Sequence, residues 1–409
     1  PRSLARNGRK TTLGETTGRA RCRNGLERGK KFRTFGDERR EPAAAPMRRA
    51  RLRRRCSPHA GRNVPRLARR LREGSASPRI VMRIEILKMA QSVFNRSIWE
   101  GFQRAFLDLH CDVVLRDAES LTADAVEPDG LDLVLAVHGG TVPVEVIEAY
   151  RRSGVPTAVY LLDEPYEVDR SSTWSRHYDY AFTVDRATVA YHDPHDRAEF
   201  LPLGYDAGRF HPEGKAYASE ILVLGSPYEH RLQMLSPLRQ RWGRRITWVG
   251  PGWAPFCSAG RHVEQLITPD ICARFYRGAQ IVVNIHRDDV WSHFGETNRR
   301  RIRATHLNPR FWEAAACGAF QLTSFRSDLE AFCPSARSFE TADELGALLE
   351  RYSDAPEERR HLASLTKGAI ATHSYRHRAE SLLLTISGVT TPDAGSRPEA
   401  KEISRKDDK

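Results

Sequence analysis

Short apolar runs alternate with amphipathic stretches from residue 83 to about residue 325, and this alternation limits the folds that the chain can adopt. The run RIEILKMA at 83–90 has the length and aliphatic content of a strand, and NRSIWEGFQRAFLDLH at 95–110 has the apolar spacing of a helix. A repeated strand-then-helix order is typical of βα units, which build parallel sheets. The sequence therefore predicts an α/β fold.

The alternation forms two series, and each has the size of a domain. The first continues through DVVLRD, LDLVLAVHGG, PTAVYLLDEP, YAFTVD and AEFLPLGYD, and the second runs through EILVLGS, RITWVGPG, QIVVNIHR and AFQLTSF. We expect two Rossmann-like domains, over 82–213 and 214–386. The ligand cleft should lie between them, where the carboxyl ends of both sets of strands face each other.

The net charge of +13 would suggest a nucleic-acid or membrane-surface partner, but the charge is confined to one end. Residues 1–81 hold 25 Lys and Arg against 6 Asp and Glu, which leaves 40 basic and 46 acidic residues in the rest. This Arg-rich segment and the polar tail over 387–409 are expected to be disordered. We interpret 1–81 as upstream sequence joined to a true start at Met82, in preference to a transit segment or a nucleic-acid arm.

Cysteine usage indicates a reducing compartment, and hydropathy argues against a membrane-spanning segment. The seven cysteines are widely spaced, with no C-x-x-C pair, which argues against a disulfide or zinc framework. No apolar stretch approaches the roughly 20 residues of a membrane-spanning helix, and no typical secretory signal peptide is evident. We expect a cytoplasmic protein without a transmembrane segment.

Candidate site residues come directly after predicted strands. They are His138 with Gly139 and Gly140, Asp163 with Glu164, Gly225 with Ser226, and Asn284. His138 could contact a bound ligand, although a histidine that ends a strand is more often a packed, hydrogen-bonded residue. Asp163 or Glu164 could orient a substrate group or act as a base, and the same residues could equally form a polar turn.

The segment NPRFWEAAACGAFQLTSF at 308–325 predicts a short helix followed at once by a strand. Asn308 suits the N-cap, Pro309 the first helical turn, and Gly318 the left-handed position after the helix. Three alanines at 314–316 would let the helix lie close to a sheet. Glu313 could bind a ligand, or it could be an ordinary helix residue that pairs with Arg310 three positions earlier.

Several segments, taken in order, carry a family resemblance. LPLGYDAGRFHP at 201–212 looks like the interdomain segment of two-domain GT-B glycosyltransferases, and the 308–325 segment is similar to the element that holds a nucleotide sugar in their second domain. With YLLDEP, VLGSPYEHR, IVVNIHR and PEERRHLASLTKGAIATHSYRHRAE, the order resembles the CgeB-like spore maturation glycosyltransferases over nearly all of 82–386.

The resemblance implies a GT-B fold and an enzyme of hexosyltransferase type that transfers with retention. A nucleoside-diphosphate sugar would be the co-substrate, no other cofactor is implied, and the acceptor is unidentified. The resemblance also implies that Glu313 accepts hydrogen bonds from ribose hydroxyls, with the helix start capped by Asn308 near the phosphates. We expect Asn284 and Arg310 to belong to the same binding set. Related retaining enzymes often carry a second Glu eight positions earlier, where this chain has Thr305.

Sugar transfer requires that the charge on the leaving diphosphate be stabilised. The D-x-D pattern of metal-dependent enzymes does not occur in the chain, so we expect no metal. Backbone N–H groups at a helix start and an Arg or Lys would then do this work. Gly225 and Ser226, which open a helix that carries Arg231, offer both, although Arg231 could be a solvated helix residue.

Two further features leave alternatives open. The basic run NRRRIRATH at 298–306 could attract a phosphorylated ligand, although such a run is usually a solvated loop. Trp253 could cover a nucleobase, although a core position is favoured.

Two other classes of protein also fit the sequence. A sugar-nucleotide epimerase has a similar two-domain plan and would convert a donor without an acceptor. A nucleic-acid-binding protein, the less favoured alternative, would owe its affinity to residues 1–81.

Overall fold

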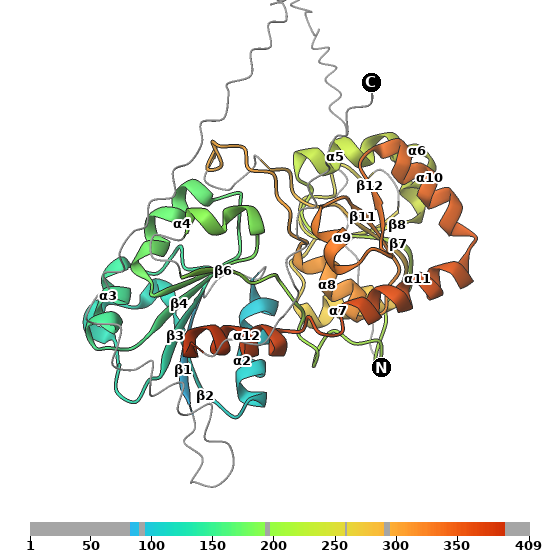
Figure 1. Cartoon of the computed structure of the whole chain (residues 1–409). Helices are drawn as coiled ribbons and strands as arrows, with labels where there is room; N and C mark the ends of the chain where they lie inside the picture. Colours follow the sequence, from blue (N-terminus) through green and yellow to red (C-terminus); the bar gives the residue numbers. More distant parts are fainter. Residues whose placement is uncertain (1–81, 90–94, 193–196, 258–259, 290–294, 389–409) are drawn as a thin grey trace, which may run out of the picture. The chain divides into compact units, whose positions relative to one another are not determined.

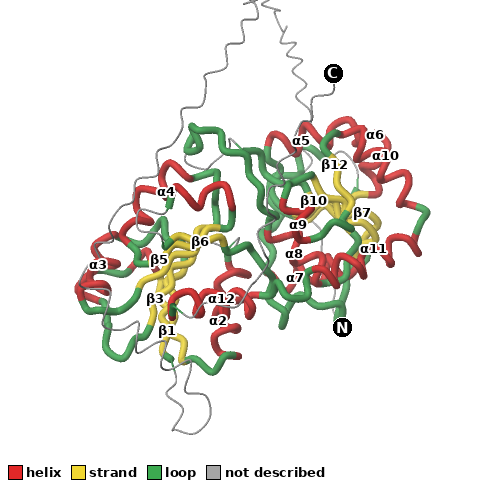
Figure 2. The backbone as a smooth tube through the Cα atoms, viewed as in Figure 1, coloured by secondary structure: helices red, strands yellow, loops and turns green. Residues whose placement is uncertain are grey.

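The computed structural model of the chain describes residues 82–89, 95–192, 197–257, 260–289 and 295–388. In these residues, strands form two six-stranded sheets in which all pairing is parallel. The strand orders are β2-β1-β3-β4-β5-β6 and β12-β11-β10-β7-β8-β9 (Figures 1 and 2). The predicted α/β fold is confirmed. The expectations for residues 1–81 and 389–409 lie outside the described residues.

The first sheet is built from the strands predicted in the first series. They are β1 (Arg83–Lys88), β2 (Asp112–Asp117), β3 (Leu133–Val137), β4 (Thr157–Leu161), β5 (Tyr180–Thr183) and β6 (Ala198–Phe200). Strands β3 and β4 are buried along their whole length, as parallel strands covered on both faces are. The helices between these strands are α2 (Arg96–Asp108), α3 (Val144–Arg152) and α4 (Val168–Trp174).

The second sheet contains two strands that the sequence did not reveal. Its strands are β7 (Ser219–Leu224), β8 (Ile246–Val249), β9 (Arg261–Val263), β10 (Ala279–Asn284), β11 (Gln321–Ser324) and β12 (Arg337–Phe339). Its helices are α5 (Glu229–Leu235), α6 (Arg239–Trp242), α7 (Pro269–Gly278), α8 (Pro309–Ala316), α9 (Asp328–Phe332), α10 (Ala342–Ser353) and α11 (Pro356–Ala369). Strands β9 and β12 lie at the sheet edges and have three residues each, too few for an apolar pattern.

Helix α8 has the start and the end that its sequence predicted. The Asn308 side chain accepts a hydrogen bond from the backbone N–H of Phe311, and Pro309 takes the first helical position. Gly318, just past the end, has a φ of 73°. The three alanines at 314–316 are buried, and their small side chains let α8 pack closely against α7 and β11.

The last helix, α12 (Tyr375–Ser387), returns to the first sheet and packs against α2 (Figure 1). The ring of Tyr375 lies 5.1 Å from that of Phe102. Gly101 makes this approach possible, because a Cβ at that position would overlap the Tyr375 ring. The predicted domain segment 214–386 thus includes a helix that packs with the first sheet.

The segment between β10 and α8 also contacts the first half of the chain. The Thr297 hydroxyl donates a hydrogen bond to the carbonyl of Tyr166 at 2.7 Å. Arg299 forms an ion pair with Asp169 of α4 at 3.1 Å. These two contacts connect the segment that precedes α8 to the residues that follow β4.

None of the helices in the described part of the chain combines the length and the hydropathy that crossing a membrane requires.

Candidate active site

A cavity of about 450 Å³ lies at the carboxyl ends of strands from both sheets. Four of its lining residues come one or two positions after a strand: His138 after β3, Asp163 after β4, Gly225 after β7 and Gly250 after β8. Open parallel sheets bind ligands at this position, and the volume is within the range of small-molecule sites. The cavity is therefore the candidate active site.

Most of the residues predicted from the sequence meet in this cavity. Eight of the ten line it: His138, Asp163, Gly225, Ser226, Arg231, Asn308, Arg310 and Glu313. The other two, Glu164 and Asn284, are buried outside the lining.

The guanidinium groups of Arg231 and Arg310 lie on the wall built by the second sheet. Arg231, in α5, donates from Nε to the carbonyl of Ile285 at 3.0 Å and from Nη1 to that of Ser226 at 2.7 Å. Arg310, in the first turn of α8, donates to the carbonyls of Leu224 and Ile285 at 3.2 and 3.0 Å. Carbonyl oxygens hold both groups in place without neutralising them.

Neither guanidinium has a carboxylate within ion-pair distance among the residues that the structure describes. Burial lowers the pKa of Arg231 well below its usual range, and the charge of Arg310 lowers it further. Burial also lowers the pKa of Arg310. Two buried cations without a counter-ion are costly, and a bound anion would relieve that cost. This wall of the cavity suits a negatively charged ligand.

Gly225 makes room for these cations. A Cβ at this position would overlap the Arg310 guanidinium, and the φ of 123° disfavours any other residue. The indole N–H of Trp253 donates to the Gly225 carbonyl at 2.6 Å. Trp253 is fully buried. It therefore supports the loop after β7, and the alternative in which it covers a nucleobase does not hold in this structure.

Asn284 and Asn308 bond to each other through their side-chain amides, at 3.1 and 3.0 Å. Asn284 also accepts a hydrogen bond from Nε of Arg310 at 3.3 Å. Asn284 thus acts on the cavity indirectly, by fixing the start of α8 and the guanidinium that faces the ligand space.

Glu313 lines the cavity and is 7 % exposed. Burial raises its pKa to about 7, although a hydrogen bond from Ser97 of α2 and the charge of Arg310 act in the opposite direction. The Tyr276 hydroxyl donates to the carboxylate over 3.4 Å, a long hydrogen bond. No Arg310–Glu313 ion pair forms among the described residues, so the helix-pairing alternative is not observed. The carboxylate remains available to accept hydroxyl donors.

Asp163 and His138 face the cavity from the first sheet. Nε2 of His138 lies 3.1 Å from the Asp163 carboxylate, and Nη2 of Arg287 lies 3.1 Å from its other oxygen. Burial alone would raise the pKa of Asp163, but His138 and Arg287 outweigh burial and hold it below its usual range. His138 has a φ of 82°, a strained value for a residue other than glycine. The two side chains thus form one rigid hydrogen-bonded group.

Glu164 points away from the cavity. Its carboxylate accepts a hydrogen bond from Ser171 and lies 3.2 Å from Nε2 of His192, in a fully buried contact. Glu167, which the sequence reasoning missed, lines the cavity instead. Burial and then the charge of Asp163 raise its pKa. Its spacing of four from Asp163 was a signal, because such spacing places both residues on one face of a helical turn.

His138, Asp163 and Glu167 offer three potential metal-ligand atoms within 4.8 Å of one another. Arg287 already supplies a positive charge to Asp163, and the backbone N–H of Gly140 donates to Nδ1 of His138 at 3.2 Å. These partners explain why the side chains of His138 and Asp163 lie together as a hydrogen-bonded group.

The basic run at 298–306 lies mainly outside the cavity. Arg299 pairs with Asp169, and the Arg300 guanidinium covers the Tyr191 ring at 4.8 Å. His306 is the residue of this run that lines the cavity.

Comparison with known proteins identifies the chain's relatives. Residues 231–384 match the family described as glycosyl transferase-like. Over 292 residues the chain is 27 % identical to spore protein CgeB of Bacillus subtilis strain 168, a match that covers 67 % of this chain and 87 % of that protein. The chain is thus similar to CgeB over two thirds of its length, and its second half contains a segment that matches a glycosyl transferase-like family. The resemblance predicted from the sequence is confirmed.

The chain has the fold of solved GT-B glycosyltransferases. An alpha-glucosyltransferase in complex with UDP and a 13-mer DNA matches with a TM-score of 0.55 at 10 % identity, over 72 % of this chain and 96 % of that one. Anabaena Alr3699/HepE in complex with UDP and glucose matches with a TM-score of 0.51 at 11 % identity, over 75 % and 100 %. At such identities the likeness concerns the fold, and it confirms the predicted GT-B architecture.

Proposed function

We propose that the protein transfers a hexose from a nucleoside-diphosphate donor to an acceptor hydroxyl, with retention at the anomeric carbon and without a bound catalytic metal. One observation carries this proposal: the buried guanidinium groups of Arg231 and Arg310 share a cavity with the carboxylate of Glu313. Guanidinium groups suit a diphosphate, and a carboxylate suits the two hydroxyls of a ribose.

The donor would lie along the wall of the second sheet. Its diphosphate would meet the two guanidinium groups and the backbone around Ser226, and its ribose would meet Glu313. The nucleobase would then extend toward Leu266, a cavity residue that is 50 % exposed and can cover an apolar ring. Two similar structures hold UDP in the same fold, which supports this donor class.

The two guanidinium groups would do the electrostatic work of the reaction. When the bond between the sugar and the diphosphate breaks, negative charge accumulates on the leaving oxygen. Carbonyl groups hold Arg231 and Arg310 in position before the substrate arrives, so little reorganisation is needed as that charge develops. His138 and Asp163, on the other wall, would contact the transferred sugar or the acceptor.

Calorimetric titration of the full chain with UDP, GDP and TDP tests the donor site. Arg231→Gln and Glu313→Ala should each weaken the tightest nucleotide roughly 10- to 100-fold, the effect of losing a hydrogen bond to a charged group. Arg241→Gln is the matched control, because Arg241 is exposed and pairs with Glu350 at the surface. Unchanged affinity in both site variants would contradict the assignment. Product analysis without an acceptor separates transfer from epimerisation, since only an epimerase changes the donor sugar.

A further inference from the structure

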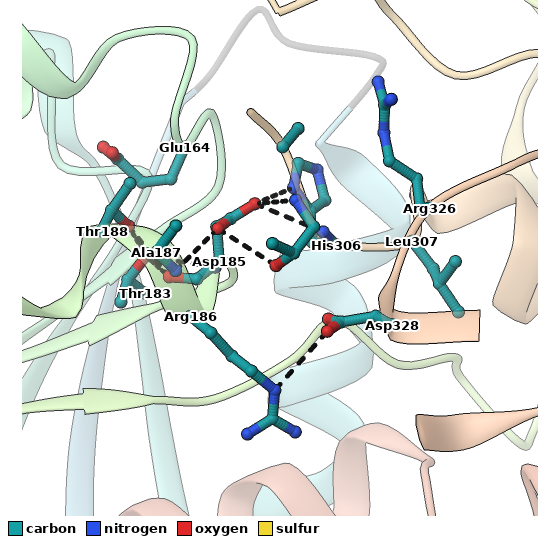
Figure 3. Close-up of polar contacts among 12 residues, drawn as sticks. Glu164, Thr183, Asp185, Arg186, Ala187, Thr188, His306, Leu307, Arg326 and Asp328 are labelled. Atoms are coloured by element: carbon teal, nitrogen blue, oxygen red, sulfur yellow. Dashed lines mark hydrogen bonds and ion pairs between the residues drawn. The ribbon is translucent and has the colours of Figure 1, made fainter. Parts of the chain in front are cut away.

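An aspartate from the first sheet contacts the segment that leads into α8. Asp185 follows β5 and is fully buried. Its carboxylate accepts hydrogen bonds from the backbone N–H of Thr305 at 2.7 Å and from the Thr305 hydroxyl at 3.1 Å. It also lies 3.1 Å from Nδ1 of His306. Figure 3 draws the contact between Asp185 and His306 as a dashed line. The carboxylate therefore fixes a histidine two residues before the Asn308 cap.

This pairing determines which imidazole nitrogen carries the proton. Burial alone would raise the pKa of Asp185, but the hydrogen bonds from His306 and from backbone groups outweigh burial and hold it below its usual range. An ionised carboxylate can only accept, so Nδ1 of His306 carries the hydrogen and Nε2 of the neutral ring has a lone pair.

The Nε2 lone pair is available to a ligand. Among the described residues, Nε2 has no hydrogen-bond partner. His306 lines the cavity and is only 5 % exposed, so its free nitrogen faces the ligand space rather than bulk solvent. A histidine whose other nitrogen is held by a buried carboxylate has the arrangement of a general base.

The predicted bases of the first sheet are engaged elsewhere. His138 uses Nε2 for Asp163 and Nδ1 for the Gly140 N–H, which leaves no free lone pair. Asp163 has a lowered pKa and is therefore a weak base. Glu164 bonds to Ser171 outside the cavity.

Charged groups face His306 from several elements. Asp163 after β4 and Asp328 in α9 interact with it electrostatically, and the Tyr166 ring lies edge-on at 5.7 Å. Burial and then nearby arginines, of which Arg326 has the largest effect, lower the pKa of His286 well below the usual range. His286 also interacts electrostatically with His306, and Arg310 and Arg231 are among the arginines that act on it. His306 therefore lies near the two guanidinium groups proposed to hold the diphosphate.

We propose that His306 is the general base of the transfer and that Asp185 is its positioning residue, an inference that rests on the function proposed above. Nε2 takes the proton of the acceptor hydroxyl as the acceptor oxygen bonds to the anomeric carbon. The bond from that carbon to the diphosphate oxygen breaks, and its electron pair leaves with the diphosphate. The Asp185 carboxylate stabilises the imidazolium, which returns its proton to solvent after the products leave.

The position of His306 also bears on stereochemistry. His306 and Arg310 lie four positions apart and line the same cavity, so we expect an acceptor hydroxyl bound to Nε2 to approach the sugar from the side on which the diphosphate departs. Attack from that side retains the anomeric configuration.

The kinetic test compares His306→Asn with the wild-type protein. The probe is the glucose conjugate of the nucleotide that binds most tightly in the titration, with water as the acceptor. We expect kcat for nucleotide release to fall roughly 100-fold or more, KM to stay within about twofold, and added imidazole to restore part of the rate. His177→Asn is the matched control, because His177 pairs with Glu148 at 3.3 Å outside the cavity.

Three results would overturn the assignment. A raised KM with unchanged kcat would make His306 a donor-binding residue. A wild-type rate in His306→Asn together with a lost rate in Glu167→Gln would move the base to Glu167. An inverted anomer in the hydrolysis product, read by proton NMR, would place attack on the other face. A wild-type protein that binds none of the nucleotides would contradict the proposed function instead.

A second measurement needs no turnover. In protein labelled with ¹⁵N-histidine, the His306 signals should show a protonated Nδ1 and a bare Nε2, and Nε2 should shift when glucose is added with the nucleotide. Asp185→Asn should change the tautomer and lower kcat roughly 10-fold or more. A protonated Nε2 in the wild-type neutral ring would rule out the base.

Discussion

Replacement of Glu313 by glutamine tests the electrostatics of the donor site without any substrate. The Glu313 side chain is 7 % exposed, and burial raises its pKa from 4.5 to about 7. Glutamine has nearly the same size and keeps an oxygen that can accept from Tyr276. It cannot ionise, however, so the substitution removes the titration and leaves the packing almost unchanged.

The size and the sign of the effect follow from this pKa. A rise of about 2.5 units corresponds to about 3 kcal/mol, because one unit equals about 1.4 kcal/mol. The folded state favours the protonated acid, so this stabilisation is fully present below about pH 4.5, where the unfolded chain is also protonated. It is lost as the pH rises toward 7, where folded Glu313 ionises. The wild-type protein should therefore lose stability over this range.

Urea unfolding at several pH values measures the effect. From about pH 4.5 to about pH 8.5, the free energy of unfolding of Glu313→Gln should rise relative to that of the wild type by up to about 3 kcal/mol. Glu357→Gln serves as the control, since its side chain is 84 % exposed. A difference between Glu313→Gln and the wild type that does not change with pH would refute the reasoning.

Three further predictions concern the same cavity. Calorimetry should show nucleotide affinity in the wild type rising as the pH passes through about 7, because an ionised Glu313 can accept both ribose hydroxyls, and Glu313→Gln should lack this dependence. Gly225→Ala should weaken nucleotide binding on the order of 10-fold, since its Cβ would displace the Arg310 guanidinium; an unchanged dissociation constant would contradict this. Asn308→Ala should cost about 1 kcal/mol of unfolding free energy through loss of the α8 cap, and Asn308→Ser, which keeps a cap, should cost less.

The order of strands and helices was readable from the sequence because apolar periodicity is local. Helix α8 is the clearest case, since its cap, its first-turn proline and its terminal glycine are all set by neighbouring residues. Strands β9 and β12 were missed because three residues carry no period. The return of α12 to α2 was also missed, because that contact joins residues far apart in the chain.

Some residues of the candidate site could likewise be predicted from the sequence, and others could not. Placement after a strand found His138, Asp163 and Gly225, because parallel strands bring their carboxyl ends to one edge. It could not decide between Asp163 and Glu164, since the conformation of the turn sends one side chain into the cavity and the other into a buried contact with Ser171. It also missed Glu167, which the same turn brings to the cavity.

By itself, the sequence determined the two βα series, the capped helix with its glutamate, and the glycine that leaves space after β7. These features depend on residues close together in the chain, so local sterics and periodicity specify them. Only the tertiary structure decided that Asp185 contacts His306 across 121 positions. It also decided that Arg231 and Arg310 lie close together with no carboxylate from the described part of the chain at ion-pair distance. Such contacts depend on how separate elements pack, and packing also removes the water that would otherwise weaken those charges.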